Sequence, residues 1–176
     1  DSLGLSHNIC EIGKERIRRV GAKIKEENSM IASNLDTGFR VLKLDSTNMK
    51  DVYYNPVDFV GNGKQVQINI EESVSNIKED RTPEDLLFQV MLDLGVLLSS
   101  KIEETVIAGK KVFNVANNFL VACFDENITD DVITQIAKQQ PYYFVMRDNS
   151  MSSDSTATNF EQIFATYSPN TIRKVL

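Results

Sequence analysis

The sequence has almost none of the residues that build metal centres, disulfide frameworks or histidine-based catalytic sites. Its 176 residues include one histidine, two cysteines and no tryptophan. Cys10 and Cys123 are too few and too far apart for a disulfide framework or a zinc site, so we expect both to be small buried hydrophobic residues. His7 lies at the start, where chains are usually loose, and any Ser–His or Cys–His catalytic pair would have to use it.

Long hydrophobic runs are missing as well. The longest apolar patches, residues 86–90 and 96–98, are short and bounded by polar residues, whereas about 20 apolar residues are needed to cross a bilayer. The beginning of the chain lacks the basic residues and the apolar segment of a secretory signal. A composition of 41% hydrophobic and 25% charged residues is typical of a globular protein. We expect a cytoplasmic protein without membrane contact.

The chain is also short of positive charge, with a net charge of −6. A domain that binds nucleic acid by itself usually has a basic balance, because neutralised phosphates supply most of the affinity. Within residues 11–27, however, six basic residues against four acidic residues give a local charge of +2, which leaves −8 for the rest. This first segment is therefore the candidate for a phosphate contact.

Residues 9–27 are predicted to form one amphipathic helix. At about 100° per residue from Ile12, one arc holds the positions Ile9, Gly13, Ile17, Val20 and Ile24. Asn8 is the predicted N-cap, with Glu11 as its capping-box partner. The apolar face needs a surface to cover. We expect that surface to belong to an upstream domain rather than to the residues that follow.

The remaining pattern predicts an α/β fold. Its mixed sheet combines an antiparallel meander with at least one parallel crossover and has flanking helices, and the separate amphipathic helix precedes it. Strands are expected at residues 39–44, 104–107, 111–115, 119–124, 142–146 and 171–175. Helices are expected at residues 82–99, 130–138 and 158–166, the first with Thr82 as N-cap and Pro83 in its first turn. We place a domain boundary between residues 1–35 and residues 36–176.

Four segments in order carry a resemblance to a known family. They are Glu15-Arg-Ile-Arg-Arg19 within residues 12–21, Gly38-Phe-Arg-Val41 within residues 37–48, Glu79-Asp-Arg-Thr-Pro-Glu-Asp-Leu-Leu87 within residues 78–88, and Thr158-Asn-Phe-Glu-Gln-Ile-Phe164. Together they resemble the C-terminal region of the methylation subunit of type III restriction–modification systems. The resemblance covers nearly the whole chain, and the start at Asp1 rather than Met fits a fragment.

The resemblance implies a parent enzyme that transfers a methyl group from S-adenosylmethionine to the N6 atom of adenine in DNA. It also implies the partners: a helicase-nuclease restriction subunit, a second methylation subunit and DNA in the full complex. The family's cofactor motif and its Asp-Pro-Pro-Tyr-like motif are both absent, and Asn55-Pro-Val-Asp58 and Gly61-Asn-Gly-Lys64 are interpreted as turns. We therefore expect this region to bind no cofactor, to lack catalytic residues and to serve subunit assembly or dimerisation, with DNA positioning as a further role.

The candidate contact residues for DNA or a partner are the basic residues of the first helix: Lys14, Arg16, Arg18 and Arg19. Arg16 falls at the edge of the apolar arc, where an unpaired guanidinium is costly. Either it pairs with an acidic group or a phosphate outside this chain, or its stem covers the apolar face while its charged end stays in water.

A second candidate is the loop after the strand at residues 142–146, because open α/β sheets place ligands at the carboxyl ends of their strands. Asp148, Asp154, Asn159 and Glu161 supply the oxygen ligands that Mg²⁺ prefers. The alternative is that Asp148 ends the strand and Asp154 or Ser155 caps the next helix. Two other function classes stay open: a stand-alone protein-interaction module, and a metal-dependent hydrolase that uses Asp148 and Asp154.

Overall fold

The computed structural model describes residues 8–50, 76–151 and 153–176. The chain divides into two compact units, Asp1–Leu44 and Asp45–Leu176, which are described separately below. His7, the turn predicted at residues 55–58 and the glycine-containing loop at residues 61–64 lie outside the described residues. Within those residues, no helix is long and apolar enough to cross a membrane.

The first unit consists of a long helix and the segment that returns along it. Helix α1, Ile9–Glu27, has the predicted bounds, and Asn8 caps it by accepting a hydrogen bond from the backbone N–H of Cys10. A 3₁₀ turn follows at Ala32–Asn34. The returning segment crosses α1 at Gly21, where an added Cβ would come within 3.0 Å of Thr37 Cβ. Gly21 is the buried residue of the helix because the chain passes so close there.

The strand predicted at residues 39–44 is wrong, since residues 35–45 have no regular secondary structure. Alternating apolar residues make a strand only when a neighbouring strand pairs with their backbone N–H and C=O groups. The Phe39 ring is instead held near α1, 5.9 Å from the Arg18 guanidinium.

The second unit is an α/β fold around a five-stranded mixed sheet whose spatial order, β1-β2-β3-β4-β5, follows the sequence. The strands are β1 Ile102–Ile107, β2 Lys110–Val115, β3 Leu120–Cys123, β4 Tyr143–Met146 and β5 Ile172–Val175. The first three form the predicted antiparallel meander. The last three are parallel, with Leu120 opposite Tyr143 and Tyr143 opposite Ile172. The fold class predicted from the sequence is confirmed.

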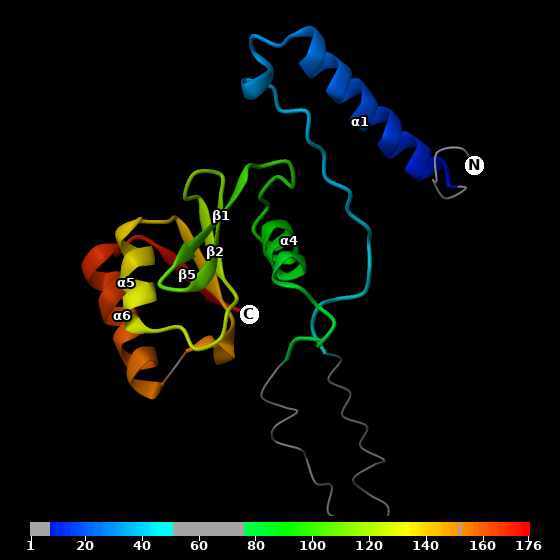
Figure 1. The fold of residues 1–176 in the computed structure, drawn as a ribbon. Coiled ribbons are helices and arrows are strands. Elements are labelled where there is room, and N and C mark those ends of the chain that lie inside the picture. Colours follow the sequence, from blue (N-terminus) through cyan, green and yellow to red (C-terminus); the bar gives the residue numbers. More distant parts are fainter. Residues whose placement is uncertain (1–7, 51–75, 152) are drawn as a thin grey trace, which may run out of the picture. The chain divides into compact units, whose positions relative to one another are not determined.

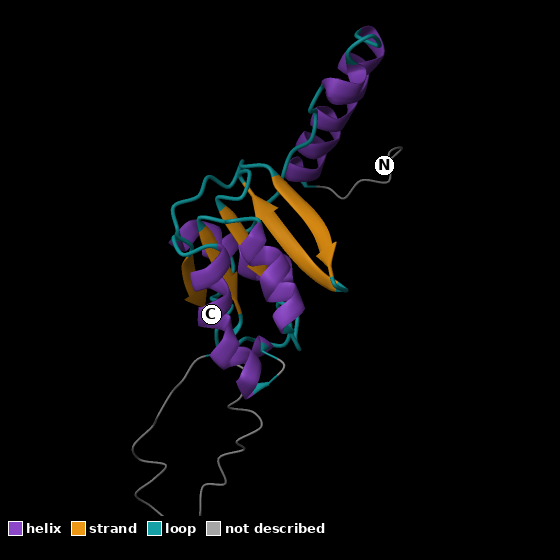
Figure 2. Ribbon diagram, turned by 90° about the vertical axis from the view of Figure 1, so that its left-hand side faces the viewer, coloured by secondary structure: helices purple, strands orange, loops and turns teal. Residues whose placement is uncertain are grey.

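Helices cover both faces of this sheet (Figure 1). Helix α5, Asp130–Lys138, connects β3 to β4, and helix α6, Asp154–Tyr167, connects β4 to β5. The two crossovers step in the same direction, so α5 and α6 lie side by side on one face, as Figure 2 shows from the helical side. Helix α4, Pro83–Asp93, covers the opposite face. The unit therefore has three layers, helix–sheet–helix.

Helix α4 begins as predicted and ends earlier. Thr82 and Asp85 form a reciprocal capping box, and Pro83 occupies the first turn. The prediction of a helix to residue 99 is wrong. Gly95 adopts φ +68°, a left-handed conformation that favours glycine, and the backbone N–H of Val96 donates back to the Met91 carbonyl. The helix stops here although the apolar pattern continues to Leu98.

Two hydrophobic clusters fill the spaces between the layers. Between the sheet and α5/α6, Phe144 of β4 contacts the rings of Phe160 and Phe164, with centroids 6.1 and 5.3 Å away. On the other face, Phe113 and Leu120 pack with the buried side of α4. Alternate residues of β2, β3 and β4 point to opposite clusters because successive side chains of a strand alternate between faces.

Candidate functional site

The apolar face of α1 is exposed. Ile9, Ile12, Ile17 and Val20 have 83%, 51%, 51% and 56% of their surface exposed. Complete burial of one such side chain is worth about 1.5–3 kcal/mol. A row of four on one helix face therefore gives a strong drive for another surface to cover it. This row, together with the less exposed Ile24, is called the α1 stripe below.

Three of the four basic residues predicted to contact DNA or a partner have acidic partners on the same helix. Lys14 Nζ lies 2.6 Å from Glu11 Oε1, and Arg19 Nε lies 2.8 Å from Glu15 Oε1. Arg18 lies 3.8 Å from the other Glu15 oxygen. The hydrogen bond from Lys14 lowers the pKa of Glu11 below its usual value. Glu11 was predicted to be the capping-box partner of Asn8. In the structure its carboxylate forms the ion pair with Lys14.

Arg16 differs from these three. It is exposed, and it has no hydrogen bond or ion pair with another residue in the described part of the chain. At 100° per residue it projects between Ile9 and Ile12 on the α1 stripe. The structure thus leaves a guanidinium group available inside an apolar face.

The predicted ligand loop is divided among structural roles. Asp148 lies in a 3₁₀ turn, Asp148–Ser150, and its backbone N–H donates to the Leu176 carbonyl. Asn159 donates to Asp130 Oδ2 over 2.8 Å and so ties α6 to the start of α5. Asp154 begins α6, whose N-cap is Ser153 rather than the predicted Asp154 or Ser155. The described residues contain no group of three or more His, Cys, Asp or Glu side chains that could hold a metal ion.

Sequence analysis missed a charged cavity of about 290 Å³ that includes Lys78, Arg81 and Arg147. It lies beside the residues that follow β3 and β4. Arg81 donates to Asp45 Oδ2 over 3.1 Å and to Ser46 Oγ over 2.8 Å, so part of its donor capacity serves the fold. A hydrogen bond from the backbone of Ser46, followed by the Arg81 pairing, lowers the pKa of Asp45. Residues this far apart in sequence give no local signal of the cavity.

An ion-pair network connects α4 to the sheet at Lys111. Its Nζ lies 2.5 Å from Glu84 and 3.1 Å from Glu104, and 4.8 Å from the centre of the Phe113 ring. The hydrogen bond to Lys111 lowers the pKa of Glu84, and the two carboxylates raise the pKa of Lys111. The lowered pKa of Glu84 means that its pairing stabilises the fold at pH values above the pKa of glutamate in the unfolded chain, and this stabilisation is lost as the pH falls through the pKa of Glu84 in the folded protein. The raised pKa of Lys111 means that its pairing stabilises the fold below the pKa of lysine in the unfolded chain, and this stabilisation is lost as the pH rises through the pKa of Lys111 in the folded protein.

We expect Lys111→Met to reduce the free energy of unfolding at pH 7 by about 0.5–1 kcal/mol, because the groups are partly exposed. The difference from the wild type should shrink as the pH falls below the ordinary glutamate pKa and through the lowered pKa of Glu84. Urea unfolding at several pH values measures this difference in the free energy of unfolding. Lys110→Met is the matched control, since Lys110 bonds a backbone carbonyl that does not titrate. An unchanged Lys111 difference at pH 3 would contradict the ion-pair account.

The two cysteines have different environments. Cys123 is fully buried in β3, and burial raises the pKa of its thiol to about 11. Cys10 is exposed, so the prediction that both are buried is wrong for Cys10. It lies on the first turn of α1.

At pH 8, we expect a disulfide reagent such as Ellman's reagent to label one thiol of the native protein. Labelling needs an accessible thiolate, which Cys123 lacks. Two thiols should react in guanidinium chloride, and Cys10→Ser should abolish native labelling. Rapid labelling of Cys123 in native Cys10→Ser protein would contradict the buried position of β3.

No protein-family model matches this chain, and no curated protein matches it.

Proposed function

We propose that this chain is the C-terminal region of the methylation subunit of a type III restriction–modification enzyme and that it serves subunit assembly. The α1 stripe is the surface that seats on the methyltransferase domain of that enzyme. The single observation that carries the proposal is the exposure of the stripe, since Ile9, Ile12, Ile17 and Val20 are each more than half exposed. The α/β unit would contact a second methylation subunit or the restriction subunit.

The physical arrangement of the resembling segments supports the proposal. Lys78 and Arg81 from one segment both bond Ser46 from another, and the Lys78 backbone N–H donates to the Asn48 carbonyl. The Asn48 side chain in turn donates to the Asp85 carbonyl at the start of α4. Residues 46 and 48 of one resembling segment are therefore bonded to the other segment within the α/β unit. The side chains that make these bonds hold the two segments together.

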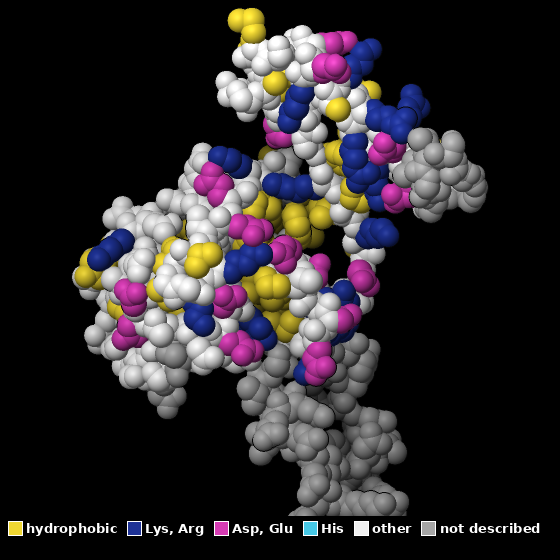
Figure 3. All heavy atoms as spheres, viewed as in Figure 1, with side chains coloured by type: hydrophobic (Ala, Val, Ile, Leu, Met, Phe, Trp, Pro, Cys, Tyr) yellow, Lys and Arg dark blue, Asp and Glu magenta, His cyan; other side chains and the backbone are white. Residues whose placement is uncertain are grey.

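The distribution of charge also favours assembly over a DNA contact by this region alone. Basic and acidic side chains are intermixed on the visible face of the α/β unit in Figure 3. Most of the basic residues of α1 that were candidates have acidic partners within the helix. In this proposal the methyltransferase domain supplies the S-adenosylmethionine site and the catalytic motifs, and DNA binds to the full complex.

The natural coding sequence upstream of residue 1 gives the first test. We expect a glycine-rich cofactor motif within roughly a hundred residues of that point, about the size of one domain. In the full methylation subunit, deletion of residues 36–176 should abolish copurification with the restriction subunit. An upstream sequence without the cofactor and Asp-Pro-Pro-Tyr-like motifs would refute the proposal.

Arg16→Ala in the full subunit is expected to reduce methylation or assembly several-fold more than Lys14→Ala does. Removing a charge that is paired across the interface leaves its partner buried and unpaired, whereas Lys14 already has Glu11 as its partner. Methyl transfer to a DNA duplex and the mass of the complex measure the two effects. Equal small losses would remove Arg16 from the interface.

The acidic balance of the chain favours one alternative, a stand-alone interaction module with no connection to DNA. A gel shift of the full subunit with duplex DNA, over a range of salt concentrations, distinguishes this alternative from the restriction–modification assignment. Binding that weakens steeply with salt supports the restriction–modification assignment.

A further inference from the structure

A second cavity lies at the amino ends of the parallel strands and has a different chemical character. Its volume is about 610 Å³, and three turns form it: the turn between β2 and β3, the turn between α5 and β4, and the turn between α6 and β5. Phe119, Tyr142 and Thr171, the residues that immediately precede β3, β4 and β5, all line it. The cavity is therefore at the edge opposite the one where sequence analysis placed a ligand.

Backbone strain concentrates around this cavity. Six non-glycine residues of the described chain have positive φ, and four of them line the cavity: Ala116, Asn117, Asn118 and Gln140. Left-handed backbone costs a non-glycine residue about 1–2 kcal/mol. Strain of this kind persists where surrounding contacts fix it, and it gathers at binding sites.

The strained turn is held in one conformation by carboxamide bonds. The Asn118 backbone N–H donates to Asn114 Oδ1 over 2.8 Å, while the Asn114 amide donates back to Asn118 Oδ1. Asn118 Nδ2 also donates to the Gln139 carbonyl over 3.2 Å, which joins this turn to the one before β4. The cavity wall is thus preorganised, so a ligand would lose little affinity to ordering it.

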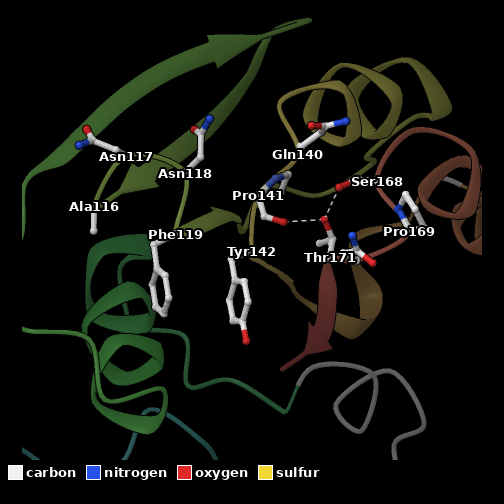
Figure 4. A pocket seen from close by; sticks show the side chains of 11 residues that line it. Ala116, Asn117, Asn118, Phe119, Gln140, Pro141, Tyr142, Ser168, Pro169 and Thr171 are labelled. Atoms are coloured by element: carbon white, nitrogen blue, oxygen red, sulfur yellow. Dashed lines mark hydrogen bonds between the residues drawn. The ribbon is translucent and has the colours of Figure 1, made fainter.

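Two aromatic rings form an exposed platform in the cavity. Phe119 and Tyr142 are stacked with centroids 5.3 Å apart and an interplanar angle of 7°, and Tyr143 supports both edge-on. Phe119 and Tyr142 remain 39% and 52% exposed. Figure 4 shows the two rings projecting side by side from the starts of their strands, beside Thr171.

Among the described residues, no charged side chain lines this cavity, although charged residues make up 25% of the sequence. Its polar groups are carboxamides and hydroxyls. The hydroxyls of Ser168 and Thr171 are satisfied internally, since Thr171 Oγ1 bonds both Ser168 Oγ and the Pro141 carbonyl. The carboxamides of Asn117 and Asn170 are exposed and have no hydrogen-bond partner in the described part of the chain. They can donate to and accept from an uncharged ligand.

We infer that this cavity binds an uncharged, proline-containing extended segment of a partner protein. Proline-rich segments in the polyproline II conformation dock on aromatic grooves, where their rings contact the aromatic faces. Their backbone makes no internal hydrogen bonds, so its carbonyls are free to accept from carboxamides such as those of Asn117 and Asn170. Nucleic acid is disfavoured because the cavity offers no cation to a phosphate. The inference does not depend on the proposed function.

An NMR titration of the ¹⁵N-labelled full chain with octaproline, acetylated and amidated to remove its terminal charges, tests this inference. We expect saturable shifts of the backbone N–H signals of Asn117, Asn118, Tyr142 and Thr171. Tyr142→Ala should weaken binding about tenfold, through loss of one aromatic contact, and Tyr142→Phe should retain it. Tyr167→Ala is the matched control, because Tyr167 is a similarly exposed aromatic residue outside the cavity.

Several results would overturn the inference. One is the absence of cavity shifts at millimolar octaproline, and another is equal binding by Tyr142→Ala and Tyr142→Phe. Equal shifts with a capped glycine–serine octapeptide would show that proline is not recognised. Cavity shifts with adenosine or glucose but none with octaproline would assign the cavity to another class of ligand.

Discussion

On the proposed function, replacing Ile17 with aspartate is expected to abolish assembly of the full protein while leaving this chain folded. Ile17 is half exposed and lies in the middle of the α1 stripe, so the substitution removes little buried surface from the isolated chain. In the proposed interface the new carboxylate would be buried in an apolar contact without a partner, which costs several kcal/mol. Each 1.4 kcal/mol is tenfold in affinity, so the interface should weaken by more than about a hundredfold.

Ala22→Asp provides the matched control for this variant. Ala22 is exposed on α1 and projects about 140° away from Ile17 at 100° per residue, so the same charge enters on the side away from the stripe. Circular dichroism should show equal helix content for both variants, and multi-angle light scattering should show loss of the complex for Ile17→Asp alone. Intact assembly of Ile17→Asp would exclude the α1 stripe as an interface and with it the main support for the proposed function.

The elements whose local signals and tertiary packing agree were predictable from the sequence. Helix α5, Asp130–Lys138, has its predicted bounds because Asp130 and Asp131 occupy the first turn, Lys138 the last, and Gln140 and Pro141 end it. The meander was predictable because turn residues separate short β-rich runs. The order strand–helix–strand–helix–strand then required parallel pairing.

Sequence analysis failed where hydrophobic pattern and backbone geometry conflict. The pattern of leucines past Asp93 continues the helical period, yet Gly95 in the left-handed region turns the chain and leaves Leu97 exposed. Residues 39–44 alternate like a strand, but no strand of the described residues pairs with them. In both places the apolar residues recur with the expected period. The conformation depends on something else: the left-handed backbone of Gly95 in the first case and the pairing of strands in the second.

The sites themselves were the least predictable part. Asn159 looked like a metal ligand beside Asp148, but the packing of α6 against α5 brings it to Asp130. The aromatic cavity joins three turns from different parts of the chain, and only the fold places Phe119 beside Tyr142. The α1 stripe is the exception, because its residues lie on one helix and a helical projection is enough to find them.

Phe144→Ala is expected to reduce the free energy of unfolding of the α/β unit by about 3–5 kcal/mol. Phe144 is fully buried at the centre of β4 and contacts both Phe160 and Phe164 of α6. Its removal leaves a cavity in the layer between the sheet and the helices. Small domains have a total stability of about 5–15 kcal/mol, so this one change should remove a large part of it.

Urea unfolding followed by far-ultraviolet circular dichroism measures the loss. Phe39→Ala is the matched control, since Phe39 belongs to the first unit and is 38% exposed; it should leave the main transition unchanged. Phe144→Leu should cost less than Phe144→Ala because the smaller cavity loses fewer contacts. A loss below about 1 kcal/mol for Phe144→Ala, the range of surface substitutions, would mean that α6 does not pack on β4. The two crossovers would then have to place their helices differently, and the three-layer arrangement would be wrong.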